Sequence, residues 1–363
     1  MLNLVKGDPR NVILGTKKLI VPQRKQLIYQ IGKRYFDKYS KERIAFSTFY
    51  ISKGFSYTDG KGEKITYEKG DREFNPPFKE ISDKWRRIDF LPKEWRTDLK
   101  SLTTALGWSV NPEHLHGFLP RRSVRTCATE IFKANSVIEV DAKDAFHQLH
   151  RREIVQILRR DLDWNKEQAE WFARLCAPKG KAQMGNPLVP ILFNIKIAKI
   201  LRKVNARIKK AGIIAYGISY ADDICFLSDK KRLPRKEIDT IECIISNYLK
   251  LNKKKTKIRH KAQGFHKLGL TIHKKGITSA YKYKRLHMVH KKYAIETEAW
   301  KPKTKNHGKW DKRQDVENHI WGHFEWITYN DFPGEKSRKL QDKLNLCRRF
   351  DIPTVLQLVI PAS

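Results

Sequence analysis

The feature that most constrains the fold is an alternation of β-rich and helical segments between residues 136 and 272. The run SVIEV at 136–140 predicts a short strand, and the apolar residues from Phe146 to Leu162 mostly recur at helical spacing. Another helix is predicted to begin near Pro190, because proline is favoured in the first helical turn. The first half of this region is therefore predicted as a strand followed by helices.

The second half of the region adds a β-hairpin, a helix and a final strand. In GISYADDICFLSD two apolar β runs flank a tight acidic turn, and isoleucines at helical spacing follow from Ile238. The last strand is predicted in HKLGLTI, at residues 266–272. The order is that of the split βαβ, ferredoxin-like plan, in which both acidic segments lie at neighbouring strand ends. We therefore predict an α+β fold.

Two acidic clusters directly follow apolar strands. Asp141 and Asp144 lie in VDAKDAF, and Asp222 and Asp223 lie in YADD. Taken separately, an ordinary hairpin turn explains the second cluster and a helix N-cap explains Asp141. Side by side, the carboxylates are costly unless a cation offsets their charge. Together they predict a site for Mg²⁺, which usually binds one or two carboxylates and substrate phosphates.

The charge balance predicts a polyanionic partner. The chain has 75 Lys and Arg against 39 Asp and Glu, a formal net charge of +36, which is best tolerated beside nucleic acid. No membrane partner is expected, because the sequence has no run of ~18 apolar residues and no signal peptide. The five cysteines form no CxxC pair, which argues against a disulfide framework or zinc site and favours a cytoplasmic setting.

Two further regions differ in composition. FSYTDGKGEKITY, within the polar residues 54–77, predicts two short strands around an Asp-Gly turn; a protruding basic hairpin and a solvated loop without a partner both fit. After about Tyr281, tryptophans recur among many basic residues, and a helical period predicts a small, mainly helical domain. We expect Trp321 and Trp326 to lie in the core of that domain rather than on a nucleic-acid surface.

A series of motifs, in the right order along the chain, resembles those of reverse transcriptases. VIEVDAKDAF looks like motif A, and SYADDICF looks like motif C with a complete YxDD box. QMGNPLVPILFN is similar to motif B, and HGFLPRRSVRT resembles the GFRPGRS-type segment of group II intron and retron-like enzymes. RIDFLP has the spacing of the fingers motif RPLGIP, whereas NKKKTKI and FHKLGLTI look like motifs D and E. With the thumb-like IWGHFEWI, the resemblance covers about residues 85–345.

The resemblance implies a right-hand polymerase with a ferredoxin-like palm, fingers and a small helical thumb. Residues 1–135 would form the N-terminal region and fingers, residues 136–275 the palm with some inserted fingers elements, and residues 276–363 the thumb. The implied activity is RNA-directed DNA synthesis, in which dNTPs are added to a primer 3′-hydroxyl by two-metal phosphoryl transfer. An RNA template, a DNA product and dNTPs are the implied partners.

The family's metal-binding roles carry over to the two acidic clusters. The resemblance implies that Asp141 and Asp222 bind two Mg²⁺ ions, with Mn²⁺ as an alternative, and that Asp223 supports the site. The backbone carbonyl of Ala142 would join the coordination. No histidine is expected to bind metal, because no close pair of histidines is joined by a carboxylate or cysteine at ligand spacing.

The resemblance also implies a nucleotide-binding set. Phe146 falls at the steric-gate position, where an aromatic ring blocks a ribose 2′-hydroxyl, although plain core packing also explains it. Gly185 would let the backbone approach the incoming nucleotide closely. Arg87 resembles the fingers residue that clamps the triphosphate through a guanidinium fork, with Arg86 beside it as a competitor. Lys255 matches the motif D lysine proposed as a general acid, and a generic phosphate-binding face is the alternative.

Three residues are implied to contact nucleic acid, and two depart from the usual motif B. The nucleic-acid set is Arg122, Tyr220 and Gly269. Met184 stands where the family usually has Gln, so a flexible apolar contact replaces a hydrogen bond near the nucleotide. Val189 replaces the usual Ser and removes a hydroxyl from the same wall. We expect altered nucleotide handling with intact chemistry.

The lineage is assigned by exclusion. The retron elements NAxxH and VTG correspond here to CATEI and KLG, and a motif B of the IGNxTSQ kind is absent. The remaining resemblance is to compact bacterial reverse transcriptases of anti-phage defence, which implies a structured non-coding RNA, with a companion protein or self-association as further options. A catalytically silent RNA-binding scaffold, a retron or group II intron-type enzyme, and an RNA-synthesising polymerase are the alternatives.

Overall fold

The computed structural model describes residues 21–59, 63–74, 76, 84–252, 255–274 and 276–279. These residues divide into two compact units. The first unit holds the described residues up to Arg122 and from Lys133 to Gln263. The second unit holds Ser123–Phe132 and the described residues from Gly264 onward.

The central sheet of the first unit has four antiparallel strands in the order β5-β6-β4-β7. The strands are β4 (Ser136–Asp141), β5 (Tyr216–Tyr220), β6 (Asp223–Ser228) and β7 (Lys257–His260). β4, the first of these four strands along the chain, lies inside the sheet between β6 and β7, as the ferredoxin-like plan requires. The predicted α+β fold with this palm arrangement is confirmed.

The last strand of this sheet was assigned to the wrong residues by the sequence pattern. β7 occupies KIRH, whereas HKLGLTI forms β8 (Phe265–Lys267) and β9 (Leu270–His273), which pair as a hairpin. Leu268 and Gly269 have φ of 53° and 77°, so the backbone reverses between them instead of continuing a strand. With β10 (Gly276–Ser279), these strands form a separate three-stranded sheet in the second unit.

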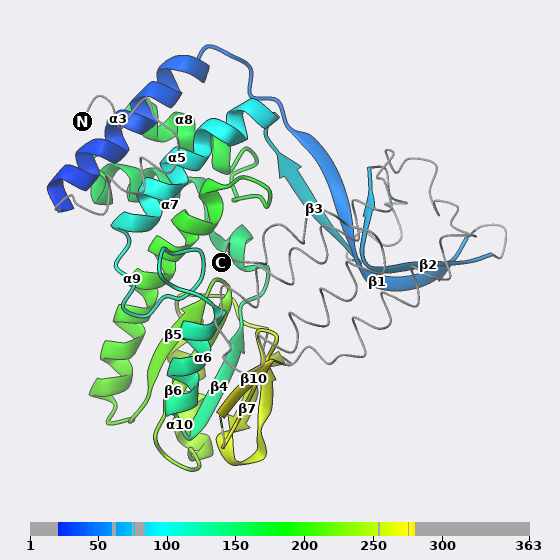
Figure 1. Cartoon of the computed structure of the whole chain (residues 1–363), viewed down its shortest axis with the longest axis vertical. Helices are drawn as coiled ribbons and strands as arrows, with labels where there is room; N and C mark the ends of the chain where they lie inside the picture. The colour runs from blue at the N-terminus through cyan, green and yellow to red at the C-terminus, as the bar shows by residue number, and fades with distance from the viewer. Residues whose placement is uncertain are drawn as a thin grey trace, which may run out of the picture. The chain divides into compact units, whose positions relative to one another are not determined.

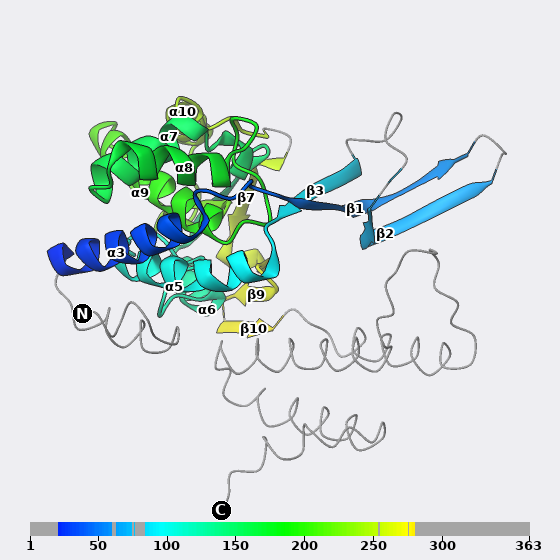
Figure 2. The ribbon, with the colours of Figure 1, turned by 90° about the horizontal axis from the view of Figure 1, so that it is seen from above.

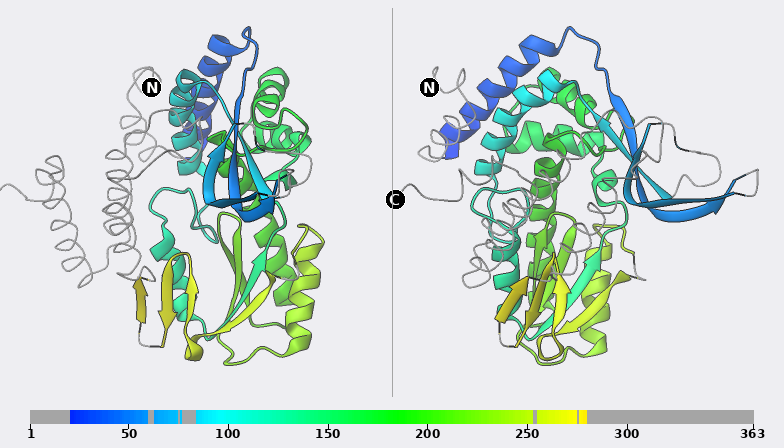
Figure 3. Two further views of the ribbon diagram at one scale, coloured as in Figure 1. Left: turned by 90° about the vertical axis from the view of Figure 1, so that its right-hand side faces the viewer. Right: turned by 45° about the vertical axis from the view of Figure 1, so that its right-hand side comes forward.

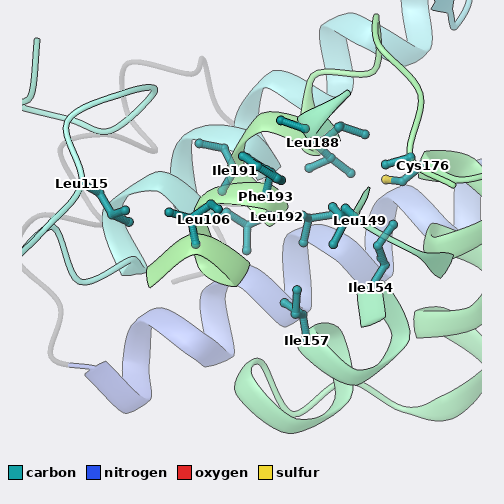
Figure 4. Packing of buried hydrophobic residues seen from close by; sticks show 14 of the residues in the cluster. Leu106, Leu115, Leu149, Ile154, Ile157, Cys176, Leu188, Ile191, Leu192 and Phe193 are labelled. Atoms are coloured by element: carbon teal, nitrogen blue, oxygen red, sulfur yellow. The ribbon is translucent and has the colours of Figure 1, made fainter. Parts of the chain in front are cut away.

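Long helices supply the hydrophobic core beside the central sheet. Helix α9 (Leu188–Lys210) follows Pro187 and contacts both β5 and helix α10 (Arg235–Ser246). Figure 1 shows α9 running along the sheet of the first unit. Its apolar side chains, including Phe193, pack with residues such as Leu149, as the close view in Figure 4 shows. The helix predicted near Pro190 is therefore confirmed.

A second group of helices carries an aromatic cluster. Helices α3 (Val21–Tyr39), α5 (Lys93–Ser109) and α8 (Lys166–Cys176) lie together, and α3 contacts the other two. Tyr35 packs edge-on against Trp95, with ring centroids 6.2 Å apart, and lies 5.8 Å from Trp171. Between α7 (Arg151–Gln156) and α8, residues Ile157–Asp161 form a π-helical turn. The sequence reasoning predicted neither α8 nor this π turn.

The predicted hairpin around the Asp-Gly turn is present and is longer than expected. Strands β1 (Ser47–Thr58) and β2 (Lys64–Glu73) pair antiparallel, and β3 (Trp85–Phe90) pairs with the other side of β1. Figures 2 and 3 show this sheet, in blue, extending away from the helices of the same unit. It is therefore a protruding hairpin.

Several predictions fall outside or at the edge of the described residues. The C-terminal domain with Trp321 and Trp326 lies outside them, and the partition into fingers, palm and thumb stays a prediction. Within the described part, Cys127, Cys176, Cys225 and Cys243 are free thiols. A search of the described helices finds no segment with the length and hydropathy of a membrane span.

Candidate active site

Strand pairing brings the two acidic clusters together. Asp141, the last residue of β4, lies opposite Asp223, the first residue of β6. Tyr220, the last residue of β5, pairs with Asp223 from the other side, so only Ala221 and Asp222 form the hairpin turn. Because antiparallel register fixes each pair, the acidic residues share one end of the sheet. The predicted neighbourhood of the two clusters is confirmed, and their metal-binding roles stay predictions.

The turn that carries Asp222 is backbone-strained and tightly supported. Ala221 has a φ of 56°, a left-handed conformation that is uncommon for residues other than glycine. Gly117 lies against this turn, where an added Cβ would come within 2.5 Å of the Ala221 backbone nitrogen. Such strain persists only when neighbouring structure holds it, and it is common at functional sites.

The segment before Gly117 extends this support. The backbone of Ser219 exchanges hydrogen bonds with His114 and His116, each 2.8 Å long. The amide of Asn194, buried in α9, donates to the Gly117 carbonyl at 2.6 Å. The HGFLP segment therefore lies against the YADD turn and is itself held by the motif B helix.

The carboxylate of Asp222 is electrostatically disfavoured. The residue is exposed, yet many protein atoms surround the carboxylate, and this partial desolvation raises its pKa. A hydrogen bond from its own backbone N–H lowers the pKa by a smaller amount. The charges of Asp223 and Asp141 raise the pKa further, whereas Arg86 lowers it. The three aspartates therefore interact, and the site has an excess of negative charge that a bound cation would offset.

The donor set fits a hard cation with few protein ligands. Within the described residues, no group of three or more His, Cys, Asp or Glu side chains is arranged to hold a metal. Asp141 and Asp222 with the carbonyl of Ala142 supply a smaller set of oxygen atoms. This fits Mg²⁺, which binds one or two carboxylates and completes its shell with water and substrate phosphates. Asp144 is exposed and lines the basic cavity that is described below.

Lys255 lies beside this carboxylate group. Its Nζ is 3.6 Å from Asp141 Oδ2, and its side chain is 64 % exposed. Its backbone N–H donates to the Asn252 carbonyl, and the Asn252 N–H donates to the Asp141 carbonyl at 2.8 Å. The structure therefore brings Lys255 to the predicted metal site, where either a general acid or a phosphate contact is chemically feasible. Lys253 and Lys254 lie outside the described residues.

Motif B begins against β3. The Met184 carbonyl accepts a hydrogen bond of 2.9 Å from the Asp89 N–H. Gly185 has a φ of 106°, and an added Cβ would overlap the Asp89 carbonyl oxygen. We predicted a close approach to the nucleotide, and the structure gives Gly185 a close approach to the β3 backbone. The conformation and the contact each require glycine.

The two β3 arginines face different partners. The guanidinium of Arg87 donates to both carboxylate oxygens of Asp89, at 2.9 and 3.0 Å, and Asp89 is buried. Arg86 points to the opposite face by strand alternation, and it is the arginine whose charge acts on Asp222. Opposite charges at i and i+2 of a strand could have revealed the Arg87–Asp89 pair from the sequence. The sequence reasoning therefore underrated Arg86.

Phe146 and Val189 have different environments. Phe146 is partly buried, and its ring lies 5.0 Å from that of Phe193 at a tilt of 59°. Both a steric gate and core packing are compatible with this position. Val189 is 1 % exposed within the core, so the idea that it lines the nucleotide wall is wrong. A serine hydroxyl there would need a buried partner.

A basic cavity adjoins the motif A loop. It has a volume of about 680 Å³, and lysines from three separate segments line it: Lys143, Lys181 and Lys250. Lys196 on α9 is 12 % exposed and pairs with Glu153 at 2.9 Å in the same cavity wall. This charge lies next to the acidic group, so the region combines a site for cations with a surrounding suited to phosphates.

The three predicted nucleic-acid contacts occupy different places. Tyr220 ends β5 beside Asp223. Arg122 is half-buried, and its backbone N–H donates to the Leu119 carbonyl. It is the last residue of the first unit before the chain passes into the second unit. Gly269 forms the β8–β9 turn of the second unit. Their contacts with nucleic acid stay predictions.

The chain is similar in sequence to one family of known proteins. Residues 75–272, more than half of the chain, match the family model described as "Reverse transcriptase (RNA-dependent DNA polymerase)". None of the curated proteins matches the chain.

Two telomerases are among the solved structures that are similar to this chain. One is apo telomerase from Candida tropicalis, truncated from its C-terminal domain: 9 % identity over 70 % of this chain and 60 % of that one, with a TM-score of 0.39. The other is telomerase from Candida albicans in complex with a TWJ fragment of telomeric RNA: 11 % identity over 75 % of this chain and 55 % of that one, with a TM-score of 0.40. The chain thus covers less than two thirds of either telomerase chain.

Proposed function

Since the chain belongs to the reverse transcriptase (RNA-dependent DNA polymerase) family, we propose that it extends a primer 3′-hydroxyl with deoxynucleotides on an RNA template. The observation that carries the proposal is the β4–β6 register, which sets Asp141 opposite Asp223 with Asp222 in the adjoining turn. A basic protein that only bound RNA would gain nothing from clustered carboxylates facing its ligand. The acidic group therefore favours catalysis over a silent scaffold.

In the proposed site, Asp141 and Asp222 hold two Mg²⁺ ions, with Mn²⁺ as an alternative, and Asp223 and the Ala142 carbonyl support them. When bound, such ions would activate the primer hydroxyl and stabilise the charge that develops on the leaving pyrophosphate. The raised pKa of Asp222, caused by burial and by its acidic neighbours, supports this assignment because a cation would remove that penalty.

The proposed reaction is an in-line displacement. The primer 3′-hydroxyl gives up its proton to water and its oxygen forms a bond to the α-phosphorus, the bond between the α-phosphorus and the oxygen bridging to the β-phosphate breaks, and pyrophosphate leaves. Lys255 gives a proton to the leaving pyrophosphate, a role supported by its position 3.6 Å from Asp141. Phe146 excludes a 2′-hydroxyl, while Met184 and Gly185 border the nucleotide.

The triphosphate is proposed to bind the arginines of β3. Arg87 has the expected sequence position, but its fork is already paired with buried Asp89. Arg86 acts on Asp222 and has no such carboxylate partner among the interactions of the described residues. Comparing Arg86→Ala with Arg87→Ala assigns the clamp, because replacing the arginine that contacts the triphosphate raises the KM for dNTP more. An unchanged KM in both variants would remove β3 from the nucleotide site.

Primer extension tests the proposed activity. Purified protein is given an RNA template, a DNA primer, labelled dNTPs or NTPs, and Mg²⁺ or Mn²⁺. We expect dNTP incorporation that EDTA abolishes and that Asp222→Asn reduces to background. Asp229→Asn is the matched control, since Asp229 is an exposed acid beyond the other end of β6. Incorporation by Asp222→Asn at the wild-type rate contradicts the proposal, and NTP incorporation would favour an RNA polymerase.

We further propose a biological setting. The sequence features favour a compact bacterial reverse transcriptase that acts in the cytoplasm in anti-phage defence, with a structured non-coding RNA and either a companion protein or self-association. Nucleic acid that co-purifies with the protein is sequenced, and phage plating is compared between wild type and Asp222→Asn. A single enriched RNA and lost protection support the setting; equal plating by both strains contradicts it.

A further inference from the structure

The side chain of Gln148 joins two segments that are far apart in the sequence. Its Nε2 donates to the Lys143 carbonyl at 2.7 Å and to the Lys250 carbonyl at 2.9 Å. Its Oε1 accepts from the Lys250 N–H at 2.7 Å. A glutamine amide has two N–H donors and a carbonyl acceptor, and all three functions are used here.

The joined segments form a short extension of the central sheet. The Lys143 N–H donates to the Lys250 carbonyl at 2.9 Å, and the Asn252 N–H donates to the Asp141 carbonyl at 2.8 Å. Ala142 and Leu251 pair as an antiparallel bridge between these bonds. Gln148 lies at the end of this ladder, where a short two-stranded pairing would otherwise fray.

This extension sets the position of Lys255. Its backbone N–H bonds to the Asn252 carbonyl at 2.9 Å, so Lys255 is hydrogen-bonded to a residue of the ladder itself. The ammonium group then lies 3.6 Å from Asp141 Oδ2. Gln148 is thus bonded to Lys250, and Asn252, two residues further along the same strand, bonds to both Asp141 and Lys255.

Gln148 is itself held in place. Its backbone carbonyl accepts a hydrogen bond from Lys196 Nζ, and Lys196 also pairs with Glu153. The Glu153 carboxylate in turn accepts the His150 N–H at 2.8 Å. Since Lys196 belongs to α9, the backbone of Gln148 is anchored to the same helix that bonds to Gly117 beside the YADD turn.

We propose that Gln148 is a positioning residue that keeps the Lys255 segment in register with Asp141. The inference rests on the proposed function and deepens it, because it names the contact that holds the proton donor beside the metal-binding carboxylate. The amide chemistry is specific. A glutamate would set a carboxylate against two carbonyl oxygens, leucine would leave the Lys143 carbonyl and the Lys250 N–H without their partner, and asparagine is one methylene too short.

Kinetics provide the first test. In Gln148→Leu and Gln148→Glu we expect kcat for primer extension to fall about 10- to 100-fold, the scale of a small misplacement of catalytic groups, with the KM for dNTP within about twofold. Gln156→Leu is the matched control, since Gln156 is exposed on α7. Wild-type kcat in Gln148→Leu would overturn the inference.

A double-mutant cycle separates positioning from general loss of structure. Lys255→Met is made alone and with Gln148→Leu, and melting temperatures are measured for every variant. If Gln148 acts through Lys255, Gln148→Leu lowers kcat further by less than about twofold in the Lys255→Met background. Multiplied losses of kcat would mean that Gln148 acts by another route and would overturn the proposal.

Hydrogen exchange provides a test that does not require activity. We expect the amides of Lys143, Lys250 and Asn252 to exchange about tenfold faster or more in Gln148→Leu, while Gln156→Leu leaves them unchanged. Unchanged exchange overturns the inference even if wild type proves inactive. Fast exchange together with an inactive wild type contradicts the proposed function and not the joining role of Gln148, so the two failures are distinguishable.

Discussion

The central sheet and the β2-β1-β3 sheet belong to the same unit but are stabilised differently. β6 is buried along almost its whole length, with only its first residue half-exposed, and β4 is nearly as buried. β1 is mostly exposed or half-exposed and buries only Ser52 fully. Strands buried on both faces cannot shift register without exposing apolar side chains. Charged groups at their ends are therefore fixed in space.

The β2-β1-β3 sheet, here called the outer sheet, relies on aromatic rings that pack across its strands, with Phe55 and Tyr67 half-buried and Trp85 buried. Phe55 stacks on Tyr67 with centroids 5.4 Å apart, and Tyr67 lies edge-on to Trp85 at 4.8 Å. Such cross-strand pairs contribute about 0.2–1 kcal/mol each, which suffices to stiffen a hairpin. The comparison teaches that the buried sheet fixes the positions of the acidic residues, whereas the exposed sheet is held by aromatic pairs and extends away from the helices of its unit.

The largest expected effect comes from the end of the central sheet. Replacing Asp141 by Asn should reduce kcat by about 10³-fold or more, since a principal electrostatic contact to the reacting groups is lost. The melting temperature should not fall, because the change removes repulsion among neighbouring carboxylates. Primer extension and thermal unfolding measure both effects. Retained activity would break the division of roles between the sheets.

Gly185→Ala tests the contact by which motif B meets β3 of the outer sheet. We expect a loss of about 2–4 kcal/mol in unfolding free energy, from strain at a positive φ and from overlap with the Asp89 carbonyl. Gly212→Ala is the matched control, since Gly212 also has a positive φ but no atom lies within 4 Å of its added Cβ. Equal losses of stability would mean that the Asp89 contact is unimportant.

Phe146→Ala tests whether the palm also selects the sugar. The variant should lose about 10- to 100-fold of its preference for dNTP over NTP, because space for a 2′-hydroxyl opens. It should also lose some stability through the contact with Phe193. Phe146→Tyr, which keeps the ring, is the control in single-nucleotide incorporation. An unchanged preference assigns Phe146 to core packing only.

The smallest effect is expected in the outer sheet. Lys64 and Lys69 are exposed on the hairpin, and replacing both by Gln should weaken binding of a primer–template duplex. The slope of log K against log salt should fall by about 2, one for each lost phosphate contact, while kcat stays unchanged. Binding titrations at several salt concentrations measure this. A reduced kcat would show that the hairpin takes part in the chemistry.

The sequence predicted those elements whose patterns are local. β4, the β5–β6 hairpin and α9 have clear periods, and the acidic turn between apolar runs indicated the Asp141–Asp223 neighbourhood. β7 was missed because its residues KIRH are mostly charged, and its identity depends on pairing with β4. A tight turn at Gly269 likewise divided a segment that has the composition of one strand.

The supporting contacts could not be predicted, because they join distant segments through single hydrogen bonds. Gln148 has no unusual neighbours in the sequence, and its three bonds arise only after the chain brings Lys250 beside Lys143. Arg86 and Arg87 are adjacent and are the same type of residue, so only strand alternation and the position of Asp89 distinguish them. Motif spacing identifies reacting groups better than the groups that orient them.

The pairing of β4 with β6 also matters during protein synthesis. Asp141 leaves the ribosome before its partners, and α9 must be made before β6 can pair beside β4. A growing chain therefore has no complete acidic group until β6 has been made and has paired with β4.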